Sequence, residues 1–80
     1  MVRPLVSEKA VDMVEKENKI TFIVKKEVSK AEIKKIFEGE FKVKVDKINV
    51  INDMKGQKKA IIKINKNYKA SDIAMKLGLL

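Results

Sequence analysis

The sequence contains no cysteine and no histidine. Without cysteine, the chain can form neither a disulfide nor a thiolate nucleophile or metal site. Without histidine, it lacks the commonest general base and metal ligand. The longest apolar runs are about three residues, such as Phe22–Val24, and are far too short to span a membrane. We therefore expect a cytoplasmic protein with no metal or other cofactor, no small-molecule substrate and no membrane insertion.

The few glycines and the placement of the acids argue against an enzyme. The acids look solvated, at helical spacings such as Glu8, Asp12 and Glu15, whereas paired catalytic carboxylates need differently tuned environments. No glycine-rich phosphate loop occurs, because each glycine is explained by a turn or a helix end. These glycines are Gly39, Gly56 and Gly78.

Positive charge is concentrated in the second half of the chain. The net charge is +8. Residues 1–40 carry nine basic and eight acidic side chains, whereas residues 41–80 carry ten basic and three acidic ones. Evenly spread lysines would only solubilise a small domain, but this cluster favours a polyanionic partner.

The 80 residues predict one domain with a thin core, spanning 1–80. Ser7 predicts the start of a first helix, and Asn18 its end. Ser29 and Glu32 form a capping box for a second helix, with Ile33, Ile36 and Phe37 as its buried stripe and Gly39 as its stop. We expect helices over 7–17, 29–39 and 70–77, and strands over 19–25, 43–51 and 59–65.

The predicted order of elements is α-β-α-β-β-α. Strand, helix and strand form a right-handed βαβ crossover, and the last two strands form a hairpin. The apolar phase slips between Val45 and Ile48, which predicts a bulge near Asp46 and Lys47. The fold class is therefore α+β, a small and mostly antiparallel sheet with packed helices.

The hairpin between the last two strands is the candidate polyanion site. Lys55, Lys58 and Lys59 surround Gly56 at its tip, and Lys63 shares a sheet face with Lys59. A narrow basic tip suits phosphate contacts, which set affinity without reading sequence. Aromatic residues are few, and the strand over 59–65 has none, so base stacking of the RNA-recognition-motif kind is not expected.

Five segments, in order, resemble ribosomal protein twenty-three of the large subunit. The Lys-Lys-Ala strand is that family's signature stretch, with Ile64 here where leucine is usual. The matching segments are Val6-Ser7-Glu8-Lys9-Ala10, Glu15-Lys16-Glu17-Asn18, Ser29-Lys30-Ala31-Glu32-Ile33-Lys34, Val43-Lys44-Val45 to Ile48-Asn49-Val50, and Lys58-Lys59-Ala60-Ile61-Ile62-Lys63-Ile64-Asn65.

The resemblance implies a structural, non-enzymatic component of the ribosome. Such a protein binds large-subunit rRNA at the rim of the polypeptide exit tunnel, contacts neighbouring ribosomal proteins and helps to dock the signal recognition particle. We expect Glu8 and Asp12 to face protein partners. The short loop over 52–57 and the lack of a long basic N-terminal extension resemble archaeal members. The expected RNA-binding residues are Arg3, Lys9, Lys55, Gly56, Lys58, Lys59 and Lys63.

The alternative is a free-standing protein-interaction adaptor with a basic surface. In that case the acid-bearing first helix would bind a partner, and the lysines would serve only for solubility.

Overall fold

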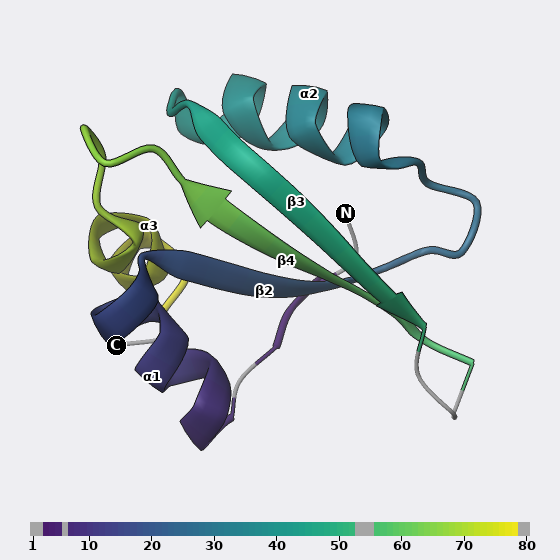
Figure 1. The fold of residues 1–80 in the computed structure, drawn as a ribbon, viewed down its shortest axis with the longest axis horizontal. Helices are drawn as coiled ribbons and strands as arrows, with labels where there is room; N and C mark the ends of the chain where they lie inside the picture. The colour runs from purple at the N-terminus through teal and green to yellow at the C-terminus, as the bar shows by residue number, and fades with distance from the viewer. Residues whose placement is uncertain (1–2, 6, 53–55, 79–80) are drawn as a thin grey trace.

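The computed structural model describes residues 3–5, 7–52 and 56–78. The order predicted from the sequence is present, preceded by one short strand that was not among the expected elements (Figure 1). The elements are β1 (Arg3–Pro4), α1 (Glu8–Glu17), β2 (Lys19–Val24), α2 (Lys30–Phe41), β3 (Val45–Asn52), β4 (Lys58–Ile64) and α3 (Ala70–Lys76).

The strands form one sheet in the order β1-β2-β4-β3, and every neighbouring pair is antiparallel. Because β2 and β3 both run antiparallel to β4, they are parallel to each other. The β2-α2-β3 crossover is therefore present, with β4 lying between its two strands. Its right-handed sense stays a prediction.

The predicted helix starts are confirmed by their hydrogen bonds. Ser7 Oγ accepts from the Ala10 amide at 3.2 Å, and Ser29 Oγ accepts from the Glu32 amide at 3.3 Å. Asn18 ends α1 in the left-handed conformation, as expected. No helix within the described ranges has the length and apolar character that a membrane crossing requires.

The predicted end of α2 and one residue of its buried stripe were wrong. The helix continues through Gly39 to Phe41, and Lys42 forms the left-handed cap. Ile36 is 42% exposed, whereas Ile33 and Phe37 are fully buried. The reason is the spacing of four residues: Phe41 continues the stripe of Ile33 and Phe37, and its ring centroid lies 4.7 Å from that of Phe37.

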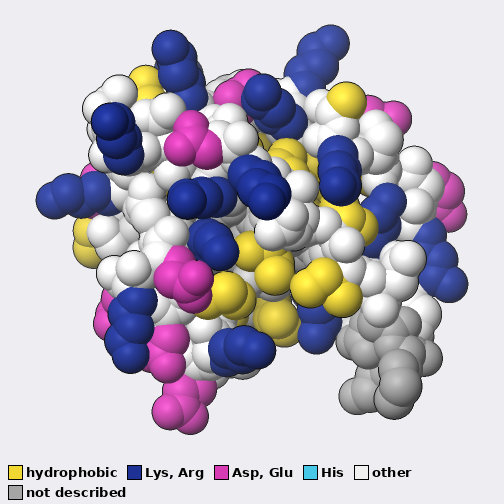
Figure 2. Space-filling model, viewed as in Figure 1, with side chains coloured by type: hydrophobic (Ala, Val, Ile, Leu, Met, Phe, Trp, Pro, Cys, Tyr) yellow, Lys and Arg dark blue, Asp and Glu magenta, His cyan; other side chains and the backbone are white. Residues whose placement is uncertain are grey.

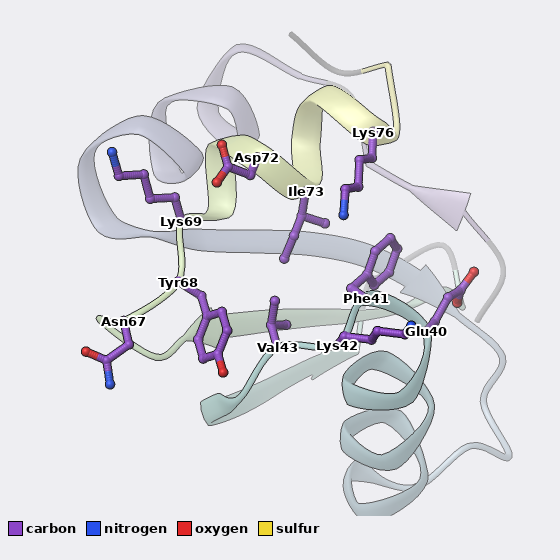
Figure 3. A pocket seen from close by; sticks show the side chains of 10 residues that line it. All are labelled: Glu40, Phe41, Lys42, Val43, Asn67, Tyr68, Lys69, Asp72, Ile73 and Lys76. Carbon is purple, nitrogen blue, oxygen red and sulfur yellow. The ribbon is translucent and has the colours of Figure 1, made fainter.

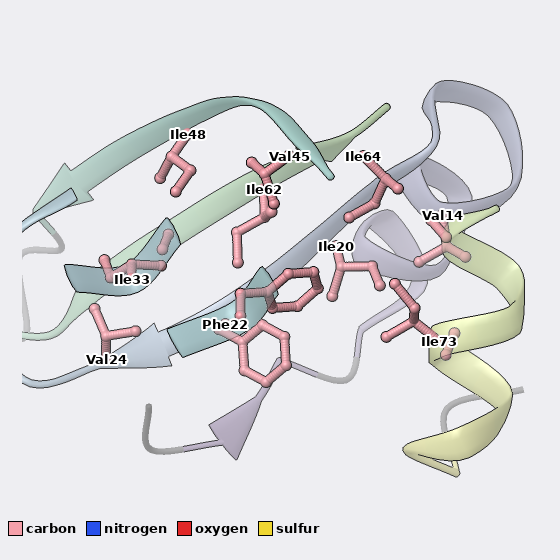
Figure 4. Close-up of a cluster of buried hydrophobic side chains, with 14 residues drawn as sticks. Val14, Ile20, Phe22, Val24, Ile33, Val45, Ile48, Ile62, Ile64 and Ile73 are labelled. Atoms are coloured by element: carbon pink, nitrogen blue, oxygen red, sulfur yellow. The ribbon is translucent and has the colours of Figure 1, made fainter. Parts of the chain in front are cut away.

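The core lies between one face of the sheet and the helices (Figure 4). Strand β2 contributes Ile20, Phe22 and Val24, and all three are buried. Strand β4 contributes Ala60, Ile62 and Ile64, which lie on the face opposite to Lys59 and Lys63. We call this side of the sheet the core face.

A bulge in β3 confirms the predicted phase slip. Val45 pairs with Ile64 and Lys47 pairs with Lys63, so Asp46 is the extra residue. After the bulge, Ile48 points to the core and Lys47 points to the opposite face. Without it, these two orientations would be exchanged, because side chains alternate along a strand.

The Asn18 side chain joins distant parts of the chain. Its Nδ2 donates to the carbonyls of Ile64 at 3.1 Å and Tyr68 at 3.0 Å. Its Oδ1 accepts from the Ala70 amide at 2.6 Å. Lys69, at the N-cap of α3, makes no side-chain capping bond. Asn18 therefore caps α3 from the end of α1.

Candidate nucleic-acid interface

Basic side chains gather on the side of the sheet opposite the core. Arg3, Lys19, Lys47, Lys59 and Lys63 occupy alternate positions to the buried residues of their strands, and we call this side the basic face. In Figure 2, lysine and arginine side chains surround a small group of hydrophobic side chains over the sheet.

Three lysines lie side by side across the basic face. Lys63, on β4, pairs with Lys19 on β2 and with Lys47 on β3. Lys19 Nζ forms an ion pair of 3.3 Å with Glu17. Lys47 and Lys63 are exposed and form no ion pair with another described residue. We call these three side chains the lysine row.

The lysine row places like charges opposite one another on three neighbouring strands. Like charges directly opposite one another on neighbouring strands are destabilising. The bulge residue Asp46 is the nearest acid along β3, but its carboxylate accepts a hydrogen bond of 2.8 Å from Asn65 Nδ2. An arrangement that repels itself is relieved when a polyanion supplies the counter-charges.

A second row crosses the basic face nearer the hairpin. Lys59 pairs with Ile23 on β2 and with Ile51 on β3, and Ile23 pairs in turn with Arg3 on β1. Arg3 is exposed and Lys59 is half-buried. The predicted residues Arg3, Lys59 and Lys63 are thus brought to one face.

Lys58 points to the other side. It shares the alternation of Ala60 and Ile62, and its Nζ donates to the backbone carbonyls of Val28 at 2.6 Å and Lys26 at 3.4 Å. Lys58 therefore fastens the turn between β2 and α2 to β4. Its predicted RNA contact stays a prediction, and the hydrogen bonds give it a structural task.

The hairpin tip is only partly described. Gly56 has a φ of +80°, a conformation that other residues rarely adopt. A Cβ at Gly56 would lie 3.3 Å from Lys26 Nζ, so the turn after β2 adds an unforeseen cation beside the tip. Lys55 lies outside the described residues, and its predicted role stays a prediction.

Sequence reasoning missed Lys19 and Lys47. Lys19 begins a strand in which Ile20, Phe22 and Val24 occupy the alternate positions, so its face could have been inferred. Lys47 required the position of the bulge, which decides the side to which it points. Their common proximity to Lys63 required the strand order, in which β4 lies between β2 and β3.

The first turns of α1 carry charges of both signs. Glu8, Lys9 and Asp12 are all exposed, while Ala10 and Val14 are buried beneath them. Glu8 and Asp12 lie one turn apart on the helix. These two acids are therefore accessible, as the predicted protein-docking role requires.

An open hollow of about 690 Å³ lies between the end of α2 and the start of α3 (Figure 3). Its apolar part includes Phe41, Tyr68 and Ile73, and its charged lining mixes both signs. In the part of the chain that the structure describes, no three acidic side chains group closely enough to hold a metal ion. The mixed charges make this hollow a weaker polyanion site than the basic face.

A comparison with protein families agrees with the segments quoted above. The family model described as ribosomal protein L23 matches residues 1–77. The match includes every strand and helix of the structure and all residues of the basic face.

Proposed function

The chain belongs to the ribosomal protein L23 family, and we propose on this basis that its single domain, residues 1–80, binds large-subunit rRNA near the polypeptide exit tunnel. Membership makes the chain a structural protein of the large ribosomal subunit, associated with rRNA and other ribosomal proteins. The family is structural and not enzymatic.

The lysine row is the observation that supports the rRNA contact most directly. Three lysines stand in register on neighbouring strands, where like charges repel, and only Lys19 has an ion pair with another described residue. Contacts with phosphates would replace that repulsion with attraction and release counter-ions from the RNA. The basic face also suits shape recognition of folded RNA, because its central strand β4 carries no aromatic residue.

The acidic edge of α1 supports a second part of the proposal, which is docking of the signal recognition particle. Glu8 and Asp12 are exposed acids, and their negative charge gives them little attraction to RNA. Basic side chains of a targeting factor could pair with them. Exposed ion pairs are worth under about 1 kcal/mol, but pairs from which docking excludes water are worth more.

Reversing the charge of Glu8 tests the docking proposal. Glu8→Lys is expected to leave incorporation into the large subunit intact and to weaken binding of the signal recognition particle to purified ribosomes. Glu32→Lys is the matched control, because Glu32 is also an exposed acid in the first turn of a helix. Equal factor affinity for both ribosomes would show that Glu8 only complements the helix dipole.

The resemblance to archaeal members of the family stays a proposal. The archaeal character depends on a short loop between β3 and β4, and residues 53–55 of that loop lie outside the described part of the chain.

Sedimentation of the native protein in a sucrose gradient separates the proposal from the alternative of a free-standing adaptor. We expect the protein to sediment with large subunits and to leave them only in high salt, because its phosphate contacts compete with salt ions. An adaptor would stay at the top of the gradient at every salt concentration.

A further inference from the structure

A groove lies on the basic face, between α1 and the sheet. It encloses about 290 Å³. Thr21 and Ile61 contribute to its lining from neighbouring strands, and Ile51 extends it along β3. Ala10 and Met13 line it from α1. The groove is therefore apolar over most of its surface and open to solvent beside the lysine row.

The hydroxyl group of Thr21 is the unexplained feature of this groove. Thr21 is 4% exposed, and its Oγ1 is buried without a hydrogen-bond partner among the described residues. A hydroxyl that is removed from water and left unpaired destabilises the folded state. Valine has nearly the same shape and would avoid this cost, so folding alone gives no reason for threonine here.

The charges around the groove identify the kind of ligand. Lys9 and Lys59 are among the lining residues, and none of the lining residues is acidic. Glu8 and Asp12 belong to the same helix as Lys9 but do not line the groove. An apolar slot with a buried hydroxyl and a basic lining is complementary to a nucleotide, which carries a flat base, polar base edges and phosphates.

We propose that this groove receives the base of an unpaired rRNA nucleotide. The inference rests on the proposed rRNA binding and adds to it a site for one splayed-out base. The base packs against Ile61 and Ile51, and Thr21 Oγ1 forms a hydrogen bond with its polar edge. Lys9 and Lys59 contact the adjoining phosphates. Unstacked bases in loops and bulges are the usual targets of specific RNA recognition.

Met13 is the lining side chain that we expect to move when a base enters the groove. Thr21 Oγ1 is covered in the free protein, so a lining side chain must move before a base can reach it. Met13 is half-buried and unbranched, and methionine adapts its conformation more readily than other apolar residues. We assign the movement to Met13, whose rotation would open the slot without moving the strands.

Thr21→Val separates recognition from folding. The variant removes the hydroxyl and keeps the shape, so the free protein should melt at the same temperature or higher. Its affinity for a transcript of large-subunit rRNA should fall about two- to tenfold, the loss of one hydrogen bond. The salt dependence should keep its slope, because no phosphate contact is lost. Chemical probing should show an unpaired base that wild type protects and Thr21→Val does not.

A second variant keeps the test decisive if Thr21→Val disturbs the strand. Ile51 is 50% exposed, so Ile51→Glu places a carboxylate in the groove without altering the core. Ile36→Glu is the matched control, since Ile36 is 42% exposed on α2 and its substitution changes the charge by the same amount. Ile51→Glu should weaken RNA binding more than Ile36→Glu does.

The failure of this proposal differs from the failure of rRNA binding itself. If the wild-type protein does not bind the transcript, the proposed function is wrong. A different outcome is that wild type binds while Thr21→Val has the RNA affinity of wild type and Ile51→Glu has that of Ile36→Glu. In that case the groove takes no base and the proposed function stands. A groove that serves a neighbouring protein would give this second result and would overturn the inference.

Discussion

Replacing Phe37 with alanine is expected to lower the free energy of unfolding by about 3–5 kcal/mol. Phe37 is fully buried in the middle of α2. Its ring meets Phe22 edge to face at a centroid distance of 5.8 Å and lies 4.7 Å from Phe41. Alanine would leave a cavity between the helix and the sheet. A chain of this length has only about 4–12 kcal/mol of stability in total.

Thermal or denaturant unfolding followed by circular dichroism measures this loss. Ile36→Ala is the matched control, because it shortens the adjacent residue of the same helix at a position that is 42% exposed. The control should cost well under half as much, since less apolar surface returns to water. Equal effects of the two substitutions would mean that α2 does not pack on the sheet through Phe37.

Removing the lysine row is expected to have the largest effect on RNA binding. With Lys19, Lys47 and Lys63 all changed to alanine, the slope of log affinity against log salt should become shallower by about 2–3 units. The physical reason is the loss of three phosphate contacts and their released counter-ions. The free protein should be no less stable, because repulsion between neighbouring strands is removed. Titration of an rRNA transcript at several salt concentrations measures the slope.

The control for this variant removes three positive charges from the helices instead of from the basic face. Lys16, Lys35 and Lys76 are exposed, one on each helix, and their triple alanine variant has the same net charge as the variant of the lysine row. Its slope should stay close to that of wild type. Equal slopes for the two variants would show that net charge, and not the basic face, determines RNA affinity.

Much of the fold could be predicted because its signals are local. Ser7 and Ser29 accept the capping bonds that their positions indicated. The strand β4 buries alternate residues as its pattern required. The end of α2 was wrongly predicted at Gly39, because a glycine inside a helix lowers stability by only about 1 kcal/mol relative to alanine. The contact between Phe41 and Phe37 repays that cost and extends the helix.

The candidate site was harder to predict, because it depends on which strands are neighbours. The sequence placed Lys58 and Lys59 together at a hairpin, yet they point to opposite sides of the sheet. Lys47 joins Lys63 only because a bulge shifts the phase of β3. The unpaired hydroxyl of Thr21 has no signature in sequence at all, since threonine is common in strands.

The hydrogen bonds of Asn18 have a consequence for how the chain folds during synthesis. Its partners Ile64, Tyr68 and Ala70 come 46, 50 and 52 positions later. Strand β2, which follows directly, finds its long antiparallel partner in β4. Contacts so distant along the chain make folding slow, because loop closure precedes the gain from pairing. Helices α1 and α2 can form early from their own caps, but β2 must wait for β4 to emerge, and the bonds of Asn18 must wait for the segment around Ala70. Until then Ile20, Phe22 and Val24 remain uncovered, and this is the interval in which a nascent chain is most exposed to aggregation.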